Sequence, residues 1–273
     1  MHGALLLRLT LFAAGAAIAL VALVRYIEPR LTFFPVAGET ATPAQSGVPC
    51  ESETIVTADG ERLRAWTMAR ADARATILYF HGNGGNLSIW APILAGVQRH
   101  GYAVHTLDYR GYGESTGRPS ERGLYRDVDA ALEWFHAAYG SRKCPSVYWG
   151  RSMGTTMAAY AAARRRPDGL ILESGFPDAR SLLRGFLPFK LLGLFSTYRF
   201  PTASYVQASH CPVLVLHGDR DRIVPFELGQ ALFEAVPQPK QFVRIAGGDH
   251  NDLEPADAET YWPAVHAFVD RLG

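Results

Sequence analysis

The stretch Gly150-Arg151-Ser152-Met153-Gly154 decides the fold of this chain. It lies between an apolar run, residues 145–149, that is typical of a buried strand and an alanine-rich run, residues 155–164, that is typical of a helix. A serine between two glycines at such a junction is typical of a nucleophile elbow, whose tight turn strains the serine backbone and exposes its hydroxyl. Because the pentapeptide also arises by chance, its interpretation depends on whether a base, an acid and an oxyanion site accompany it.

Loops further along the chain supply a base and an acid. A serine hydroxyl is a weak nucleophile at neutral pH, so it needs an imidazole to take its proton and a carboxylate to orient that imidazole. One strand-like run leads into a loop with Asp219 and Asp221, and the next leads into a glycine-rich loop with His250. Ser152, a carboxylate and His250 therefore each follow a predicted strand, in that order along the chain.

An upstream loop offers an oxyanion site. The strand-like run 75–80 ends in His81-Gly82-Asn83-Gly84-Gly85-Asn86, and glycines let backbone amides approach a substrate oxygen closely. A dinucleotide-binding loop is disfavoured, because the spacing is not G-x-G-x-x-G and no acidic partner for a ribose follows on the next strand. A glycine-rich connection without a binding role is the remaining alternative.

From about Glu51 to its C-terminus the chain resembles an alpha/beta-hydrolase. More narrowly, it is similar to the small membrane-anchored serine hydrolases of the alpha/beta-hydrolase domain-containing group, which share a set of motifs. In this chain those motifs are His81-Gly82-Asn83, DYRGYGES at 108–115, the elbow at 150–154, HGDRDRIVP at 217–225, and His250. The set is specific for the fold and the group and says little about the substrate.

The resemblance implies a role for each matched residue. Ser152 is the expected nucleophile, His250 the general base and acid, and Asp221 the carboxylate that orients it. The expected oxyanion donors are the backbone amides of Asn83 and Met153, the second being the residue after the nucleophile.

Asp219 is the rival for the acid. The spacing HG-x-x-D of the resembling group assigns the acid to Asp221. Asp219 is then expected to be a solvated carboxylate paired with Arg220 or Arg222, an interaction of little energetic weight.

The N-terminal segment, residues 1–36, predicts a membrane anchor and a juxtamembrane stretch. Residues 9–24 are almost entirely apolar and, with residues 5–7, are long enough to cross a bilayer, since Arg8 near the start can extend to the interface. A cleavable signal peptide is the competing interpretation. The A-x-A patterns lie inside the apolar run and not after it, which favours an uncleaved single-pass anchor. Basic residues flank both sides of the run, so the positive-inside rule assigns no orientation.

The rest of the chain predicts a linker and one catalytic domain. Residues 37–48 are rich in Thr, Pro, Gly and Ala, which is typical of a linker, and residues 49–273 suit a single domain. Strand-like runs alternate there with helical runs, at 54–56, 63–68, 77–80, 103–107, 146–149, 170–172, 213–216 and 242–245. The pattern predicts a mostly parallel eight-stranded sheet with helices on both faces.

One segment departs from this alternation and predicts a small cap at about 176–208. Apolar side chains recur there at helical spacing, namely Leu183, Phe186, Leu187, Leu191, Leu194 and Phe195. Packing against the sheet edge explains this stripe as well as a wall for an acyl chain does.

Together these features predict a monomeric serine hydrolase that cleaves an ester, thioester or amide through an acyl-enzyme, with no cofactor and no metal. The expected substrate is a small molecule or a lipid acyl group, and the expected location is a membrane. A net charge of +1 without a basic stripe argues against a nucleic-acid partner. The contrasting interpretation is an inactive alpha/beta-hydrolase scaffold that serves as a membrane-tethered binding protein. Such scaffolds usually lose a member of the triad, whereas this chain retains all three.

Overall fold

A computed structural model describes residues 2–139, 144–184 and 196–273. Its centre is an eight-stranded sheet with the order β10-β9-β8-β7-β4-β6-β3-β2. The strands are β2 (Glu51–Val56), β3 (Arg62–Met68), β4 (Ala75–Phe80), β6 (Tyr102–Leu107), β7 (Ser146–Arg151), β8 (Gly169–Glu173), β9 (Val213–Gly218) and β10 (Lys240–Ile245). All neighbours are parallel except β2 with β3 and β3 with β6. Each predicted run lies within one of these strands, so the predicted sheet is confirmed.

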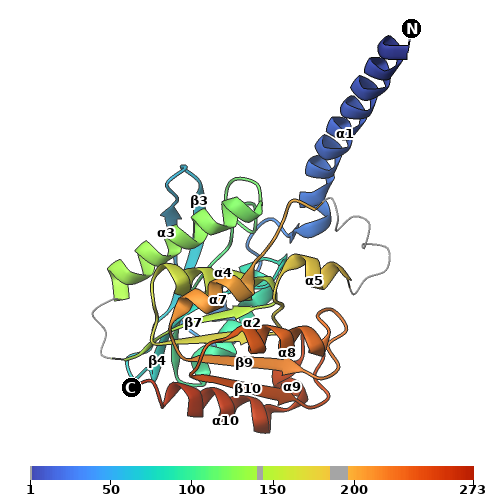
Figure 1. Cartoon of the computed structure of the whole chain (residues 1–273). Helices are drawn as coiled ribbons and strands as arrows, with labels where there is room; N and C mark the ends of the chain where they lie inside the picture. The colour runs from blue at the N-terminus through green and yellow to red at the C-terminus, as the bar shows by residue number, and fades with distance from the viewer. Residues whose placement is uncertain (1, 140–143, 185–195) are drawn as a thin grey trace.

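Helices cover both faces of the sheet (Figure 1). On one face pack α2 (Leu87–Arg99) and α10 (Ala258–Val269), and on the other pack α3 (Glu121–Tyr139), α4 (Met153–Arg164), α7 (Thr202–Ser209) and α8 (Phe226–Ala235). Shorter helices are η1 (Pro43–Ser46), α5 (Ala179–Arg184) and α9 (Leu253–Ala256). The two cores follow from side-chain alternation along the strands. In β4, Leu78 and Phe80 belong to one core, and Ile77 and Tyr79 belong to the other.

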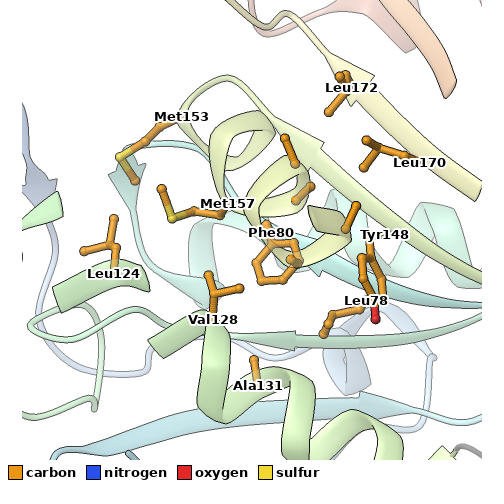
Figure 2. Close-up of a cluster of buried hydrophobic side chains, with 14 of the residues drawn as sticks. Leu78, Phe80, Leu124, Val128, Ala131, Tyr148, Met153, Met157, Leu170 and Leu172 are labelled. Carbon is orange, nitrogen blue, oxygen red and sulfur yellow. The ribbon is translucent and has the colours of Figure 1, made fainter. Parts of the chain in front are cut away.

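Helix α4, which follows the elbow, packs closely on the sheet because much of its buried surface is alanine. Its buried alanines are Ala158, Ala159, Ala161 and Ala162. Figure 2 shows Met153 and Met157 of α4 in one cluster with Phe80 of β4 and with Leu124 and Val128 of α3. Dense packing of this kind fixes the N-terminus of α4, and with it Ser152, relative to the sheet.

An N-terminal helix, α1 (His2–Thr32), projects away from the domain (Figure 1). Its part Leu5–Thr32 contains an 18-residue stretch with a mean hydropathy of 2.2 and is long and apolar enough to cross a membrane. The chain after it forms β1 (Phe34–Pro35), which pairs with β5 (Gly84–Gly85) in a second, two-stranded sheet. The C-terminal end of α1 is therefore held against the loop that follows β4.

The segment 37–48 differs from the linker that its composition predicts, because it packs on the domain. The Glu39 carboxylate accepts hydrogen bonds from Arg64 Nε at 2.8 Å and from Trp66 Nε1 at 3.0 Å. Val48 is buried, with 3% of its surface exposed. Partly buried polar contacts and one buried apolar side chain thus hold this segment in place, despite the flexibility that Thr, Pro and Gly suggest in isolation.

The expected cap at 176–208 is described only in part. Of its apolar stripe, Leu183 is described, and Phe186, Leu187, Leu191, Leu194 and Phe195 lie outside the described residues. The C-terminal part of the segment forms α7, which belongs to the core and not to a cap. Val206 is fully buried there, and Thr202 Oγ1 lies 2.7 Å from Thr156 Oγ1 of α4.

Candidate active site

The elbow has the strained geometry that its sequence predicts. Ser152 joins β7 to α4 with φ 54° and ψ −121°, a backbone conformation that non-glycine residues rarely adopt. A Cβ on Gly150 would lie 2.1 Å from the carbonyl oxygen of Gly154, and a Cβ on Gly154 would lie 2.0 Å from that of Phe80. Both glycines are required because backbone atoms fill the space of any side chain.

The structure brings Ser152, His250 and Asp221 together. Ser152 Oγ lies 2.9 Å from His250 Nε2, and His250 Nδ1 lies 2.8 Å from Asp221 Oδ2. The other carboxylate oxygen, Asp221 Oδ1, accepts the backbone N–H groups of Ile223 at 2.9 Å and Val224 at 2.7 Å. Three hydrogen bonds thus fix the carboxylate, which in turn fixes the imidazole against the serine.

Asp219 lies in the same loop as Asp221, but its hydrogen-bond partners are Arg244 and Gly247 and not His250. Its Oδ2 accepts hydrogen bonds from Arg244 Nε at 2.9 Å and Nη2 at 2.5 Å, and its Oδ1 accepts the N–H of Gly247 at 2.8 Å. The Arg244 guanidinium holds the pKa of Asp219 below its usual range. The prediction that Asp219 pairs with Arg220 or Arg222 is therefore wrong. The neighbouring strand β10 presents Arg244 to this carboxylate instead.

Asp249 joins the loop of the acid to the loop of the histidine. Its carboxylate accepts the backbone N–H of Arg222 at 3.0 Å, the Nε of Arg222 at 2.6 Å and the backbone N–H of His250 at 2.8 Å. The hydrogen bonds from the backbone and side chain of Arg222 lower the pKa of Asp249. These hydrogen bonds of Asp249 were not predicted from the sequence, in which Asp249 is one of several loop carboxylates.

Arg151 binds the backbone of His250. Its Nη2 donates to the carbonyl oxygen of His250 at 3.0 Å, and its Nε lies 3.4 Å from Glu173 Oε1. Glu173 also accepts hydrogen bonds from Trp149 Nε1 at 3.1 Å and from the hydroxyl of Tyr261 at 3.0 Å. All of these groups are buried. The variable position of the elbow motif therefore carries a positioning residue that the motif does not reveal.

The two expected oxyanion residues line the same cavity as Ser152. Met153 is the first residue of α4, so its N–H has no acceptor within the helix. The Tyr112 hydroxyl donates to the carbonyl oxygen of Asn83 at 2.9 Å, and Asn83 Nδ2 donates to the carbonyl oxygen of Thr32. Within the described part of the chain, no hydrogen bond engages the backbone N–H of Asn83. Both amides are thus available to a ligand, and Tyr112 is a further positioning residue.

Two other histidines near the site are held as scaffold. His81 Nδ1 lies 2.7 Å from the carbonyl oxygen of Gly82, and His217 Nε2 lies 2.9 Å from that of Val224. Both rings are fully buried, and burial lowers the pKa of His217.

A cavity of about 900 Å³ opens at Ser152 and His250. Its walls are mostly apolar, and they include Ile89 and Trp90 of α2 and a row of side chains from α1. A volume of this size is typical of sites for small organic ligands. The contribution of α1 was not expected from the sequence, which indicates a membrane anchor and no role in a binding site.

Comparison with known proteins agrees with this fold. The family model described as alpha/beta hydrolase fold matches residues 75–210. An uncharacterized protein of Mycobacterium tuberculosis is 33% identical over 245 residues, which cover 89% of this chain and 87% of that protein. An uncharacterized membrane protein of Saccharomyces cerevisiae is 31% identical over 239 residues, which cover 85% and 84%.

Two further similarities concern named hydrolases. Alpha/beta hydrolase domain-containing protein 17B of Xenopus tropicalis is 34% identical over 184 residues, which cover 67% of this chain and 62% of that protein. A solved esterase of Pyrococcus furiosus superposes with a TM-score of 0.71 at 19% identity and covers 88% of this chain and 97% of that chain, a likeness of fold. The chain belongs to the alpha/beta-hydrolase family.

Proposed function

We propose that this protein is a serine hydrolase that cleaves carboxylic ester or thioester bonds through an acyl-enzyme. The observation that carries the proposal is the hydrogen-bonded row from Ser152 Oγ through His250 to Asp221, with separations of 2.9 and 2.8 Å. Distances of this size are those that a nucleophile, its base and an orienting acid require.

In the proposed reaction, His250 Nε2 takes the proton of Ser152 while Oγ attacks the acyl carbon. The backbone amides of Asn83 and Met153 donate hydrogen bonds to the oxyanion that forms. Protonated His250 then gives its proton to the departing alkoxide or thiolate, which leaves the acyl group on Ser152. A water molecule, deprotonated by His250, releases the carboxylic acid and regenerates the serine. Asp221 stabilises the imidazolium in both steps.

The proposal extends to location and substrate. Helix α1 would cross a bilayer and hold the domain at its surface, which the length and hydropathy of Leu5–Thr32 support. The apolar lining of the cavity supports lipid or acylated substrates.

Labelling with a fluorophosphonate probe tests the proposal. We expect the full-length protein to be labelled and Ser152→Ala to be unlabelled at an unchanged melting temperature. Loss of Ser152 should lower kcat on p-nitrophenyl acetate by about 10⁴-fold to 10⁶-fold. A folded wild-type protein that neither labels nor hydrolyses esters would instead support an inactive scaffold.

A further inference from the structure

One face of α1 forms a wall of the cavity at Ser152. Leu20, Leu23, Val24, Ile27 and Leu31 all line it. Their spacing of three and four residues brings them to one side of the helix. At a rise of about 1.5 Å per residue this face extends for about 16 Å along the axis. The cavity is therefore a groove between α1 and the domain that ends at the candidate nucleophile.

The same helix is the candidate membrane span, and its residues indicate how far into the bilayer the groove would extend. A bilayer core takes about 20 helical residues. A span that begins at Leu5 therefore ends near Val24. Arg25, Tyr26 and Arg30 follow, and basic and aromatic side chains of this kind are typical of the interface. The groove thus begins beside the apolar part of this candidate span, at Leu20 to Val24.

Contacts at the C-terminal end of α1 hold the helix in this position. The Glu28 carboxylate is buried and accepts the N–H of Thr197 at 2.8 Å and the hydroxyl of Ser196 at 2.5 Å. Phe33 is buried and meets the ring of Tyr198 edge to face, with centroids 5.4 Å apart. With the hydrogen bond from Asn83 to Thr32, these contacts make α1 a fixed wall of the groove.

We propose that α1 is part of the active site and guides a long fatty acyl chain from the bilayer to Ser152. The chain would lie along the face from Leu20 to Leu31, with its ester or thioester carbon at the serine and the rest of the chain toward the membrane interior. This assignment rests on the proposed hydrolase function and adds the substrate class and its route. The fatty acyl chain of a lipid and that of an acylated peptide would bind in the same groove.

Two valines on α1 provide a matched pair for the test. Val24 lines the cavity, whereas Val21 does not and is 46% exposed. In Val24→Trp the indole would fill the groove, so we expect kcat/KM for a long-chain substrate to fall about tenfold or more. Activity of the same variant on p-nitrophenyl acetate, whose acyl group is too short to extend along α1, is the reference, and we expect the ratio of long-chain to acetate activity to fall. Val21→Trp, which adds the same bulk to the outer face, should change neither activity.

The measurement uses full-length protein in phosphatidylcholine vesicles. Separate samples contain a hexadecanoyl glycerol ester and an S-hexadecanoyl peptide, and whichever is hydrolysed identifies the carrier of the chain. The proposal is overturned if Val24→Trp leaves the ratio of long-chain to acetate activity unchanged, or if Val21→Trp lowers that ratio equally.

A second measurement does not depend on either variant being folded. A hexadecyl fluorophosphonate with a diazirine at the end of its chain is reacted with wild-type protein in the same vesicles and irradiated. We expect mass spectrometry to find the probe on Ser152 with cross-links on α1 between residues 20 and 31. A probe on Ser152 with cross-links only elsewhere overturns the route along α1 and leaves the hydrolase intact. Failure of the probe to attach to Ser152 would instead contradict the proposed function itself.

Discussion

At the scale of single residues, the two aspartates in the loop after β9 differ in their hydrogen-bond partners. Asp221 is bound to His250 and to two backbone amides, whereas Asp219 is bound to Arg244 and Gly247. Of these two carboxylates only Asp221 contacts the imidazole, so we assign the orienting role of the proposed mechanism to Asp221.

We expect Asp221→Asn to lower kcat by about 10⁴-fold, because an amide at this position favours the wrong tautomer of His250. Asp219→Asn is the matched control and should change kcat less than about tenfold, since it only weakens an exposed ion pair. Steady-state kinetics on p-nitrophenyl acetate with both variants checks this. A larger loss in Asp219→Asn would assign the acid to Asp219.

The buried His217 makes the free energy of unfolding depend on pH. Burial lowers its pKa, so the folded protein disfavours the charged ring. Burial likewise lowers the pKa of His100, His136 and His266. The unfolded chain therefore binds more protons below the ordinary histidine pKa of about 6.5. It follows that the contribution of these histidines to the free energy of unfolding rises as pH increases through this region, levels off above it, and is lost as pH falls.

Urea unfolding between about pH 5 and pH 7.5 measures this slope, with His217→Asn as the comparison. The variant should be less stable throughout and should show a shallower slope. An identical slope in the two proteins would mean that His217 does not contribute to it.

At the scale of elements, the turn from β7 into α4 is limited by backbone contacts. A Cβ at Gly154 would meet the carbonyl of Phe80, whereas one at Gly96 in α2 would meet nothing within 4 Å. Gly154→Ala should therefore destabilise the protein by about 1–3 kcal/mol or more through overpacking. Gly96→Ala should stabilise it by about 0.5–1 kcal/mol, since alanine loses less backbone entropy in a helix. Thermal unfolding of the two variants compares them directly, and equal destabilisation would contradict this explanation.

The sheet and the meeting of Ser152, His250 and Asp221 could be predicted because each follows its own apolar run. Parallel strands end at one edge of a sheet, so residues just after them converge. The wall formed by α1 could not be predicted in this way. From Leu9 to Val24 the helix is almost entirely apolar, so it lacks the period that marks a buried face. Arg151 and Asp249 were missed because their roles depend on contacts between distant segments and not on local pattern.

At the scale of the whole molecule, the C-terminal end of α1 and the chain that follows it are attached to the domain. Thr32, Phe33 and Glu39 all contact the domain, and α1 closes one side of the cavity. Removal of α1 by a signal peptidase would open the proposed active site to water, so this arrangement favours an uncleaved anchor.

The mass of the mature protein, isolated from membranes, distinguishes the two interpretations. We expect a chain that includes α1 and that stays in the membrane fraction after extraction with alkaline carbonate. A mature chain that begins after the apolar run and is released by carbonate would contradict the anchor and, with it, the groove.

In the proposed mechanism Ser152 carries the acyl group during turnover, and trapping that acyl-enzyme tests the mechanism most directly. Full-length protein is mixed with p-nitrophenyl acetate, quenched in acid within milliseconds, digested and analysed by mass spectrometry. We expect an acetyl group on the peptide that contains Ser152, in an amount that matches the initial burst of p-nitrophenolate, and no such group in Ser152→Ala. Turnover without an acylated Ser152, or with the acetyl group on another residue, would contradict the mechanism.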